Sequence, residues 1–277
     1  MNKNDQKFLA MLPKYLRYVD YIGVAQLYLK ENFFLREELK PEHFKPRILG
    51  HWGTVPGLNF IYANLNYLVW KHKCEMMLIV GPGHGAPAVL ANLFVDGTLR
   101  EFYPEFRVDG VGMGKLIHDF SWPHTCFPSH VTPGVPGSIL EGGELGYSLS
   151  TAYGSVLDNP NLITAVVCGD GESETGPMAT AWHSNKFLNP KTSGAVLPIV
   201  HINGYKISNP TIYGTMSDSE LMALFRGYGY EPLIVDESGT EKKMLEALEK
   251  AYGIIREIQK NARRRFTFTR SARAKLL

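Results

Sequence analysis

The stretch that decides the fold is Leu162-Ile-Thr-Ala-Val-Val-Cys168-Gly-Asp-Gly-Glu172, an apolar run that ends in a polar, glycine-rich turn. A second apolar run, 196–203, ends at Asn203. Both runs are short and apolar on both faces, which is typical of buried parallel strands. Because parallel strands end on one edge of a sheet and bind ligands there, Asp170 and Asn203 are predicted to converge.

The converging oxygen atoms predict a site for a divalent metal that holds a diphosphate. Mg²⁺ takes oxygen ligands, usually one or two carboxylates, and completes its shell with waters and ligand phosphates. The Asp170 carboxylate, the Asn203 amide and the Tyr205 main-chain carbonyl meet that requirement. An alternative remains open, because Asp-Gly and Asn-Gly pairs also mark ordinary turns.

Glycines around the acidic residue favour the functional interpretation. Gly169 and Gly171 let the backbone come close to a bulky diphosphate. A helix predicted to begin near Gly176 would offer free N–H groups to an anion. The sequence therefore predicts that the metal and the diphosphate share this edge of the sheet.

Size and composition indicate a globular cytoplasmic protein. The chain has 277 residues, 44% of them hydrophobic, which is enough for one large domain, expected over residues 1–259. No apolar run approaches the roughly 20 residues of a membrane span, and no targeting segment is evident. The three cysteines are widely spaced, so reduced thiols are expected rather than disulfides or a zinc site.

A basic block occupies the end of the chain, residues 260–277, with seven Lys or Arg side chains and no acid. Net charge is +2 overall, so residues 1–259 sum to 22 minus 27, or −5. Such a block can bind nucleic acid or a membrane, yet it is more often a disordered solvated tail. We expect neither a nucleic-acid nor a membrane partner.

Helical and strand patterns alternate along the chain, which predicts an α/β fold with a mostly parallel sheet and helices on both faces. The stretch 102–136 has no sustained periodicity and is expected to be an ordered functional loop. The predicted helices are 16–29, 58–70, 86–94, 142–153, 176–187, 217–225 and 241–259, and the predicted strands are 76–80, 162–168, 196–203 and 231–235.

Three glycine-flanked turns carry histidines: His51, His84 and His130. Histidine titrates near neutrality and can both donate and accept protons, so together these side chains suit sugar chemistry with several proton transfers. Any one of them, taken alone, is more often a structural or surface residue.

The turn at residues 81–86 also matches the G-x-G-x-x-A form of the dinucleotide fingerprint, between a strand and a helix. A nicotinamide-dependent oxidoreductase is therefore an alternative. Against it, Pro82 removes a main-chain donor, and the acidic residue about 20 positions on, Glu101, does not end a strand.

Taken together, these motifs resemble the N-terminal part of the phosphoketolases, over residues 15–262. The resemblance is carried by residues 45–62, Gly81-Pro-Gly-His-Gly85, Glu141-Gly-Gly-Glu-Leu-Gly-Tyr147, residues 169–177, residues 182–187, His201-Ile-Asn-Gly-Tyr205 with its continuation to 210, and residues 226–232.

The resemblance implies a thiamine-diphosphate-binding fold that is incomplete at its C-terminus, and an aldehyde-lyase activity of carbohydrate metabolism. Phosphoketolases use thiamine diphosphate and Mg²⁺ to cleave xylulose 5-phosphate or fructose 6-phosphate with inorganic phosphate, giving acetyl phosphate and an aldose phosphate. By resemblance, His51, His84 and His130 lie near the sugar, and the metal ligands are those inferred above. The remaining residues implied to line the cofactor are Thr54, Gly143, Gly169, Gly171 and Glu172.

The length of the chain sets further expectations. Phosphoketolases are much longer and assemble as homodimers, and the half that clamps the pyrimidine ring of the cofactor has no counterpart here. We therefore expect a fragment without turnover on its own, and the basic residues after Ala262 are interpreted as out-of-frame coding. The alternative is a non-catalytic relic or a subunit that requires a partner.

Overall fold

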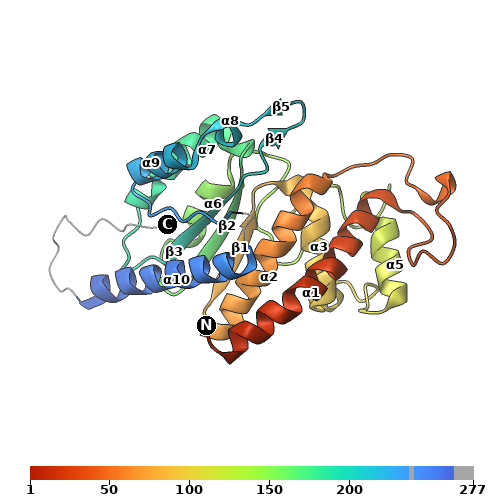
Figure 1. The fold of residues 1–277 in the computed structure, drawn as a ribbon, viewed down its shortest axis with the longest axis horizontal. Helices are drawn as coiled ribbons and strands as arrows, with labels where there is room; N and C mark the ends of the chain where they lie inside the picture. The colour runs from red at the N-terminus through yellow and green to blue at the C-terminus, as the bar shows by residue number, and fades with distance from the viewer. Residues whose placement is uncertain (237–239, 265–277) are drawn as a thin grey trace. The chain divides into compact units, whose positions relative to one another are not determined.

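The computed structural model describes residues 1–236 and 240–264. Cα packing divides the chain into two compact units. Unit 1 comprises Met1–Ala63 and Pro82–Gly143, and unit 2 comprises Asn64–Gly81 and the chain from Glu144 onward. The ribbon in Figure 1 labels the elements of both units.

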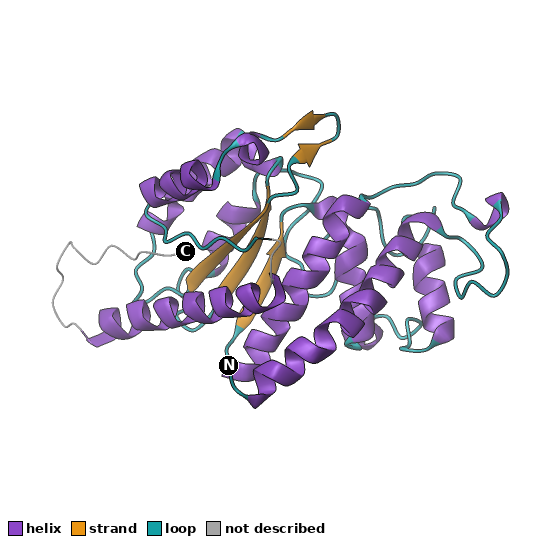
Figure 2. Cartoon of the chain, in the orientation of Figure 1, coloured by secondary structure: helices purple, strands orange, loops and turns teal. Residues whose placement is uncertain are grey.

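Unit 2 is built on a three-stranded parallel sheet in the order β1-β2-β3, drawn as orange arrows in Figure 2. The strands are β1 (Met76–Val80), β2 (Ile163–Gly169) and β3 (Ala195–His201). Every residue of the central strand β2 is buried, as its unbroken apolar sequence requires. The three strands that the sequence predicts here are confirmed.

Helices cover the sheet. The helix α6 (Ser148–Ser155) contacts all three strands and lies behind them in Figure 1, whereas α10 (Thr240–Arg264) runs in front of them. An apolar stripe on α10 is buried, because its hydrophobic residues recur at helical spacing. The predicted parallel α/β fold with helices on both faces is confirmed.

Shorter elements complete unit 2 between these helices. They are η4 (Glu172–Glu174), α7 (Gly176–Ala181), η5 (Trp182–Lys186), β4 (Tyr205–Lys206), β5 (Asn209–Pro210), α8 (Ile212–Thr215) and α9 (Asp218–Tyr228). Ser217 and Glu220 form the predicted capping box at the start of α9. β4 and β5 pair as a small antiparallel hairpin.

Unit 1 is helical. Its longest helix, α1, packs against α3 and α5. Its elements are α1 (Lys3–Tyr28), η1 (Pro41–His43), η2 (Trp52–Thr54), the first part of α2 (Val55–His72), η3 (Gly83–Gly85), α3 (Ala86–Val95), α4 (Thr98–Phe102) and α5 (Gly110–Asp119).

Some predictions of secondary structure are wrong. Residues 231–235 form no strand, because Pro232 lacks a donor and no described strand pairs with the segment. The predicted helix 142–153 begins only at Ser148, since Gly146 has a left-handed φ of +100°. The expected loop 102–136 contains the helix α5.

The basic block straddles the limit of the described residues. Residues 260–264 continue α10, beyond the predicted end of that helix at 259. The rest of the predicted tail, 265–277, lies outside the described residues.

Within the described ranges, 1–236 and 240–264, no helix is both long and apolar enough to cross a membrane.

Candidate functional site

The ends of β2 and β3 meet in unit 2. In the parallel register Gly169 pairs with His201, and the N–H group of Asp170 donates to the His201 carbonyl oxygen at 3.3 Å. The residues that follow both strands therefore lie at the same edge of the sheet. The predicted meeting of the two strand ends is confirmed, and the convergence of the Asp170 and Asn203 oxygen atoms on a metal stays a prediction.

The Asp170 side chain is buried at this edge, with 4% of its surface exposed. Its Oδ2 atom accepts hydrogen bonds from Gly204 N at 2.9 Å and from Thr211 Oγ1 at 2.8 Å. Its Oδ1 atom accepts one, from Gly171 N at 2.9 Å. All three groups are donors, so both oxygen atoms of the Asp170 side chain act as acceptors.

The two other predicted metal ligands lie in the adjacent exposed loop. Asn203 Oδ1 accepts a hydrogen bond from Tyr205 N at 3.1 Å, and Gly204 between them has a φ of +83°. The loop thus carries an amide and a main-chain carbonyl beside the strand end that carries the Asp170 carboxylate. This donor set of hard oxygens suits Mg²⁺.

In the described part of the chain, no metal site built only from His, Cys, Asp and Glu side chains is found. No group of three or more His, Cys, Asp or Glu side chains there could hold a metal ion. A cation at this edge of the sheet would therefore depend on mixed oxygen donors, as the sequence predicts.

Gly171, one of the predicted diphosphate glycines, has only ordinary contacts around it. A Cβ atom on Gly171 would meet Lys206 Cβ at 3.5 Å and Thr211 Cγ2 at 3.9 Å, which are ordinary contacts. Packing within unit 2 therefore does not demand glycine at this position. The prediction that glycine stands at position 171 so that the backbone can come close to a ligand is unaffected.

The helix predicted to begin near Gly176 is shorter than expected. α7 ends at Ala181 and continues as η5. Its first turn contains Pro177, which has no N–H group, and the Met178 N–H donates to Thr175 Oγ1 at 3.4 Å. Fewer main-chain donors are thus left for an anion than a longer, uncapped helix would offer.

The Glu172 side chain is buried and accepts hydrogen bonds from three protein groups, which we call the Glu172 hub. Its Oε1 accepts from Gly146 N at 3.1 Å and Ser148 Oγ at 2.7 Å, and its Oε2 accepts from Gly169 N at 3.2 Å. Burial raises the pKa of Glu172, and these hydrogen bonds oppose that shift. The side chain ties the end of β2 to the start of α6.

The same carboxylate explains the glycine that follows β1. A Cβ atom on Gly81 would lie 2.1 Å from Glu172 Oε2 and 2.6 Å from Ser148 Oγ. Only glycine leaves room for the hub. In the dinucleotide fingerprint the second glycine, here Gly83, lets the backbone approach the pyrophosphate. A Cβ atom on Gly83 would lie 2.2 Å from the Gly142 carbonyl oxygen, so protein atoms already fill that space.

The three predicted histidines come together in unit 1. The ring centroids of His51 and His84 are 5.6 Å apart, and those of His84 and His130 are 6.4 Å apart. Thr54 Oγ1 lies 2.9 Å from His84 Nε2, and Ser129 Oγ lies 2.9 Å from His130 Nδ1. We call these rings, His51, His84 and His130, the histidine cluster.

Close glycine packing brings the cluster together. A Cβ atom on Gly83 would lie 2.2 Å from the Gly142 carbonyl oxygen, and one on Gly142 would lie 2.7 Å from Gly83 Cα. Val131 N donates to Gly83 O at 3.0 Å, and Gly142 N donates to Val131 O at 2.7 Å. The turn that carries His84 is thereby joined to the loop that carries His130.

The three rings of the cluster are accessible to different degrees. None of the three rings is fully buried, and His51 is exposed. Hydroxyl partners on His84 and His130 orient two of the rings, which is what a donor or acceptor of protons requires. Of the other predicted residues in unit 1, Thr54 is 2% exposed, and Gly143 is exposed with its N–H directed to Glu141 Oε1 at 3.4 Å.

Sequence reasoning missed a buried cation in unit 1, Lys45, which is 5% exposed. Its Nζ atom donates to the carbonyl oxygens of Gln26 at 2.8 Å and Phe120 at 2.6 Å. It therefore ties the segment that leads to His51 to the end of α1. A lone lysine in a loop gives no sequence signal for burial.

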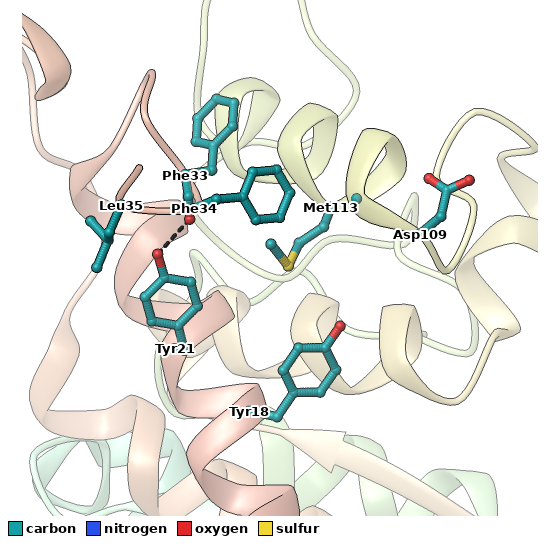
Figure 3. A pocket seen from close by; sticks show the side chains of 8 residues that line it. Tyr18, Tyr21, Phe33, Phe34, Leu35, Asp109 and Met113 are labelled. Atoms are coloured by element: carbon teal, nitrogen blue, oxygen red, sulfur yellow. Dashed lines mark hydrogen bonds between the residues drawn. The ribbon is translucent and has the colours of Figure 1, made fainter. Parts of the chain in front are cut away.

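A separate pocket of about 430 Å³ lies elsewhere in unit 1, shown in Figure 3. Aromatic and aliphatic side chains dominate its lining, which comprises Tyr18, Tyr21, Phe33, Phe34, Leu35, Asp109, Gly110 and Met113. The Tyr21 hydroxyl donates to Phe33 O at 2.5 Å, and Asp109 caps α5 through Gly112 N. None of the predicted site residues lines this pocket.

Comparison with known proteins identifies the relatives of the chain. The curated protein "Probable phosphoketolase" of Bradyrhizobium diazoefficiens is 54% identical over 258 residues, which cover 92% of this chain and 32% of that protein. Its counterpart in Brucella abortus is 53% identical over 257 residues, with the same coverage. The chain thus spans about a third of the length of these relatives.

Solved structures agree on the fold. A transketolase mutant from Pichia stipitis has a TM-score of 0.60 at 16% identity, covering 99% of this chain and 35% of that one. Transketolase from Campylobacter jejuni has a TM-score of 0.59 at 16% identity, covering 100% of this chain and 37% of that one. At this level of identity the likeness concerns the fold alone.

A family model described as the XFP N-terminal domain matches residues 3–274, which include most of the basic block. This match and the curated relatives do not favour the nicotinamide alternative or a non-catalytic relic. The chain belongs to the XFP N-terminal domain family and corresponds to the N-terminal region of phosphoketolases.

Proposed function

We propose that this chain is the metal- and diphosphate-binding part of a thiamine-diphosphate-dependent phosphoketolase. The substrates would be xylulose 5-phosphate or fructose 6-phosphate with inorganic phosphate, and the products acetyl phosphate and an aldose phosphate. Family membership supports the reaction class. The single observation that carries the site is the buried Asp170 carboxylate, held by donors where β2 and β3 end together.

Asp170, Asn203 and the Tyr205 carbonyl are the proposed ligands of Mg²⁺. They fit that ion because Asp170 is fixed by hydrogen-bond donors alone and the exposed loop beside it supplies two neutral oxygen atoms. Gly169 and Gly171 would admit the diphosphate, and Thr54, Gly143 and Glu172 are further proposed cofactor residues. Glu172 would act by fixing the strand ends, given its three internal hydrogen bonds.

The bound cofactor would supply the electron sink for carbon–carbon cleavage. The chain's own residues would bind and orient the ligands and move protons. His84 and His130, each positioned by a hydroxyl partner, and the exposed His51 are proposed to exchange protons with the hydroxyl groups of the sugar. Imidazole suits such an exchange because its two ring nitrogen atoms can donate and accept protons.

Binding measurements test the proposed metal and diphosphate site. Calorimetric titration with thiamine diphosphate in Mg²⁺ should show saturable binding to the unmodified chain. Asp170→Asn should weaken this binding at least about 100-fold. Loss of a residue that only hydrogen-bonds a metal ligand already lowers metal affinity about 10- to 100-fold, and Asp170 is a proposed ligand itself. Asp218→Asn, at an exposed aspartate of unit 2, is the matched control and should leave binding unchanged. Equal binding by the Asp170 variant would refute the assignment.

Turnover is a separate matter, because the chain spans about a third of its relatives' length. We propose that it forms no acetyl phosphate by itself and that the intact enzyme is a cytoplasmic homodimer. Incubation with cofactor, Mg²⁺, sugar phosphate and phosphate, followed by hydroxamate detection, checks the first point. Robust acetyl phosphate formation by the chain alone would overturn it, and sizing by light scattering would check the assembly of the intact enzyme.

A further inference from the structure

A second layer of residues surrounds the proposed metal ligands in unit 2. We propose that Thr211, assisted by Glu174, is a positioning residue that locks the metal-binding loop and commits one oxygen of Asp170 to the protein, so that the other faces the metal. The inference rests on the proposed function of this edge of the sheet.

Thr211 is fully buried, with 0% of its surface exposed. Its Oγ1 atom accepts a hydrogen bond from Gly214 N at 3.1 Å and donates one to Asp170 Oδ2 at 2.8 Å. A hydroxyl group has a single proton. Because Gly214 N is a donor, that proton is directed to Asp170, and the orientation of the hydroxyl group is fixed.

The two oxygen atoms of Asp170 are therefore unequal. Oδ2 receives two hydrogen bonds, from Thr211 and Gly204, whereas Oδ1 receives one, from Gly171. A carboxylate oxygen offers about two acceptor positions. Oδ2 is thus saturated by the protein, and Oδ1 keeps the position that a cation can occupy.

Thr211 also closes the loop that carries the other ligands. Its main-chain N–H donates to Gly204 O at 3.0 Å, while Gly204 N donates to Asp170. A Cβ atom on Gly214 would lie 2.6 Å from Gly204 Cα, so the two ends of the loop touch. Asn203 and Tyr205 flank Gly204, so the backbone that carries both ligands is held at this contact.

Glu174 holds the same loop from the side of η4. Its Oε1 atom accepts from Ile212 N at 2.8 Å, and its Oε2 atom pairs with Lys206 Nζ in the hairpin. Glu174 thus links the residue after Thr211 with the residue after Tyr205. Outer partners of this kind orient metal ligands and commonly set metal affinity.

Titration of the chain with Mn²⁺, followed by the electron paramagnetic resonance of the free ion in saturating thiamine diphosphate, tests the inference. Thr211→Val should weaken Mn²⁺ binding about 10- to 100-fold. Thr211→Ser, which restores the hydroxyl group, should bind within about threefold of the unmodified chain. The matched control is Thr215→Val, because the Thr215 hydroxyl donates only to the Ile212 carbonyl, and it should bind normally.

Each outcome has a distinct meaning. If the unmodified chain binds Mn²⁺ and Thr211→Val binds it equally well, the positioning role is wrong while the proposed metal site stands. If the unmodified chain fails to bind, the proposed site fails and the inference fails with it. Should circular dichroism show Thr211→Val to be unfolded, Glu174→Ala takes its place. The affinity of that variant for Mn²⁺ should fall about 10-fold. Normal Mn²⁺ binding by it would overturn the positioning role proposed for Thr211 and Glu174.

Discussion

At the residue scale, Glu172 is a buried side chain of unit 2 whose carboxylate accepts three hydrogen bonds. Glu172→Ala leaves three buried donors without a partner and should lower the free energy of unfolding by about 3 kcal/mol, at roughly 1 kcal/mol for each. Urea denaturation measures the change. Glu144→Ala, at an exposed glutamate of the same unit, should be neutral. Equal midpoints for the two variants would contradict the role of the hub.

Lys45 predicts a pH dependence of stability. Burial lowers its pKa to about 8 from the ordinary 10.5, while Asp119 opposes the shift. The unfolded chain then binds more protons than the folded chain between about pH 8 and pH 10.5, so the contribution of Lys45 to stability should rise with pH across that window. Below pH 8 the cost of the buried charge is fully present.

Unfolding curves between pH 7.5 and pH 10.5 check this dependence. The control is Lys45→Met, which cannot titrate, and subtracting its pH profile isolates the lysine. The variant should itself be destabilised by about 2 kcal/mol, because the Gln26 and Phe120 carbonyl oxygens lose their buried donor. Parallel profiles for the two proteins would show that Lys45 does not titrate in this range.

At the element scale, the capping box at the start of α9 is a local test of stability. Ser217 N donates to Glu220 Oε2 at 2.8 Å, and Glu220 N donates to Ser217 Oγ at 3.4 Å. Ser217→Ala should cost about 1 kcal/mol. Thermal unfolding compared with Ser208→Ala, at an exposed serine of the hairpin turn, gives the measurement. A cost shared by both variants would argue against a capping effect.

Elements with strong periodicity could be predicted from sequence, and those with conflicting signals could not. β2 is apolar at nearly every position, so its burial follows from sequence alone. α5 was missed because Gly110, Gly112 and Gly114 are poor helix formers, although its cap, Asp109, was a usable signal. α1 begins at Lys3 rather than at 16, because a capping box between Asn2 and Asp5 starts the helix, which then continues through Pro13.

At the scale of the whole molecule, exposed apolar side chains gather on one segment of unit 2. Ile207 is 100% exposed, Tyr205 70% and Ile212 57%. Such side chains mark interaction surfaces or sites of self-association. Ile207→Asp should therefore reduce concentration-dependent association of the chain in sedimentation velocity. Val111→Asp, at a residue of unit 1 that is 71% exposed, provides the comparison, and an equal effect of both would deny this segment a special role.

The candidate site shows where sequence reasoning stops. Asp170, Asn203 and the three histidines could be chosen because the order of strands and turns brings strand ends and glycine turns together. Thr211 could not, because its importance depends on which atom its single proton faces, and that depends on Gly214 folding back onto Gly204. Contacts between side chains far apart in sequence produce no repeating pattern of residues from which they could be predicted.

The back-to-back contact of Gly83 and Gly142 has a consequence for how this family can vary. Each occupies the space where the other would carry a side chain, so enlarging one cannot be relieved by shrinking the other, which is already the smallest residue. Both positions are therefore expected to remain glycine. In a library of all single substitutions selected for folded protein, no substitution should be tolerated at either glycine. No second substitution at the opposite glycine should restore folding.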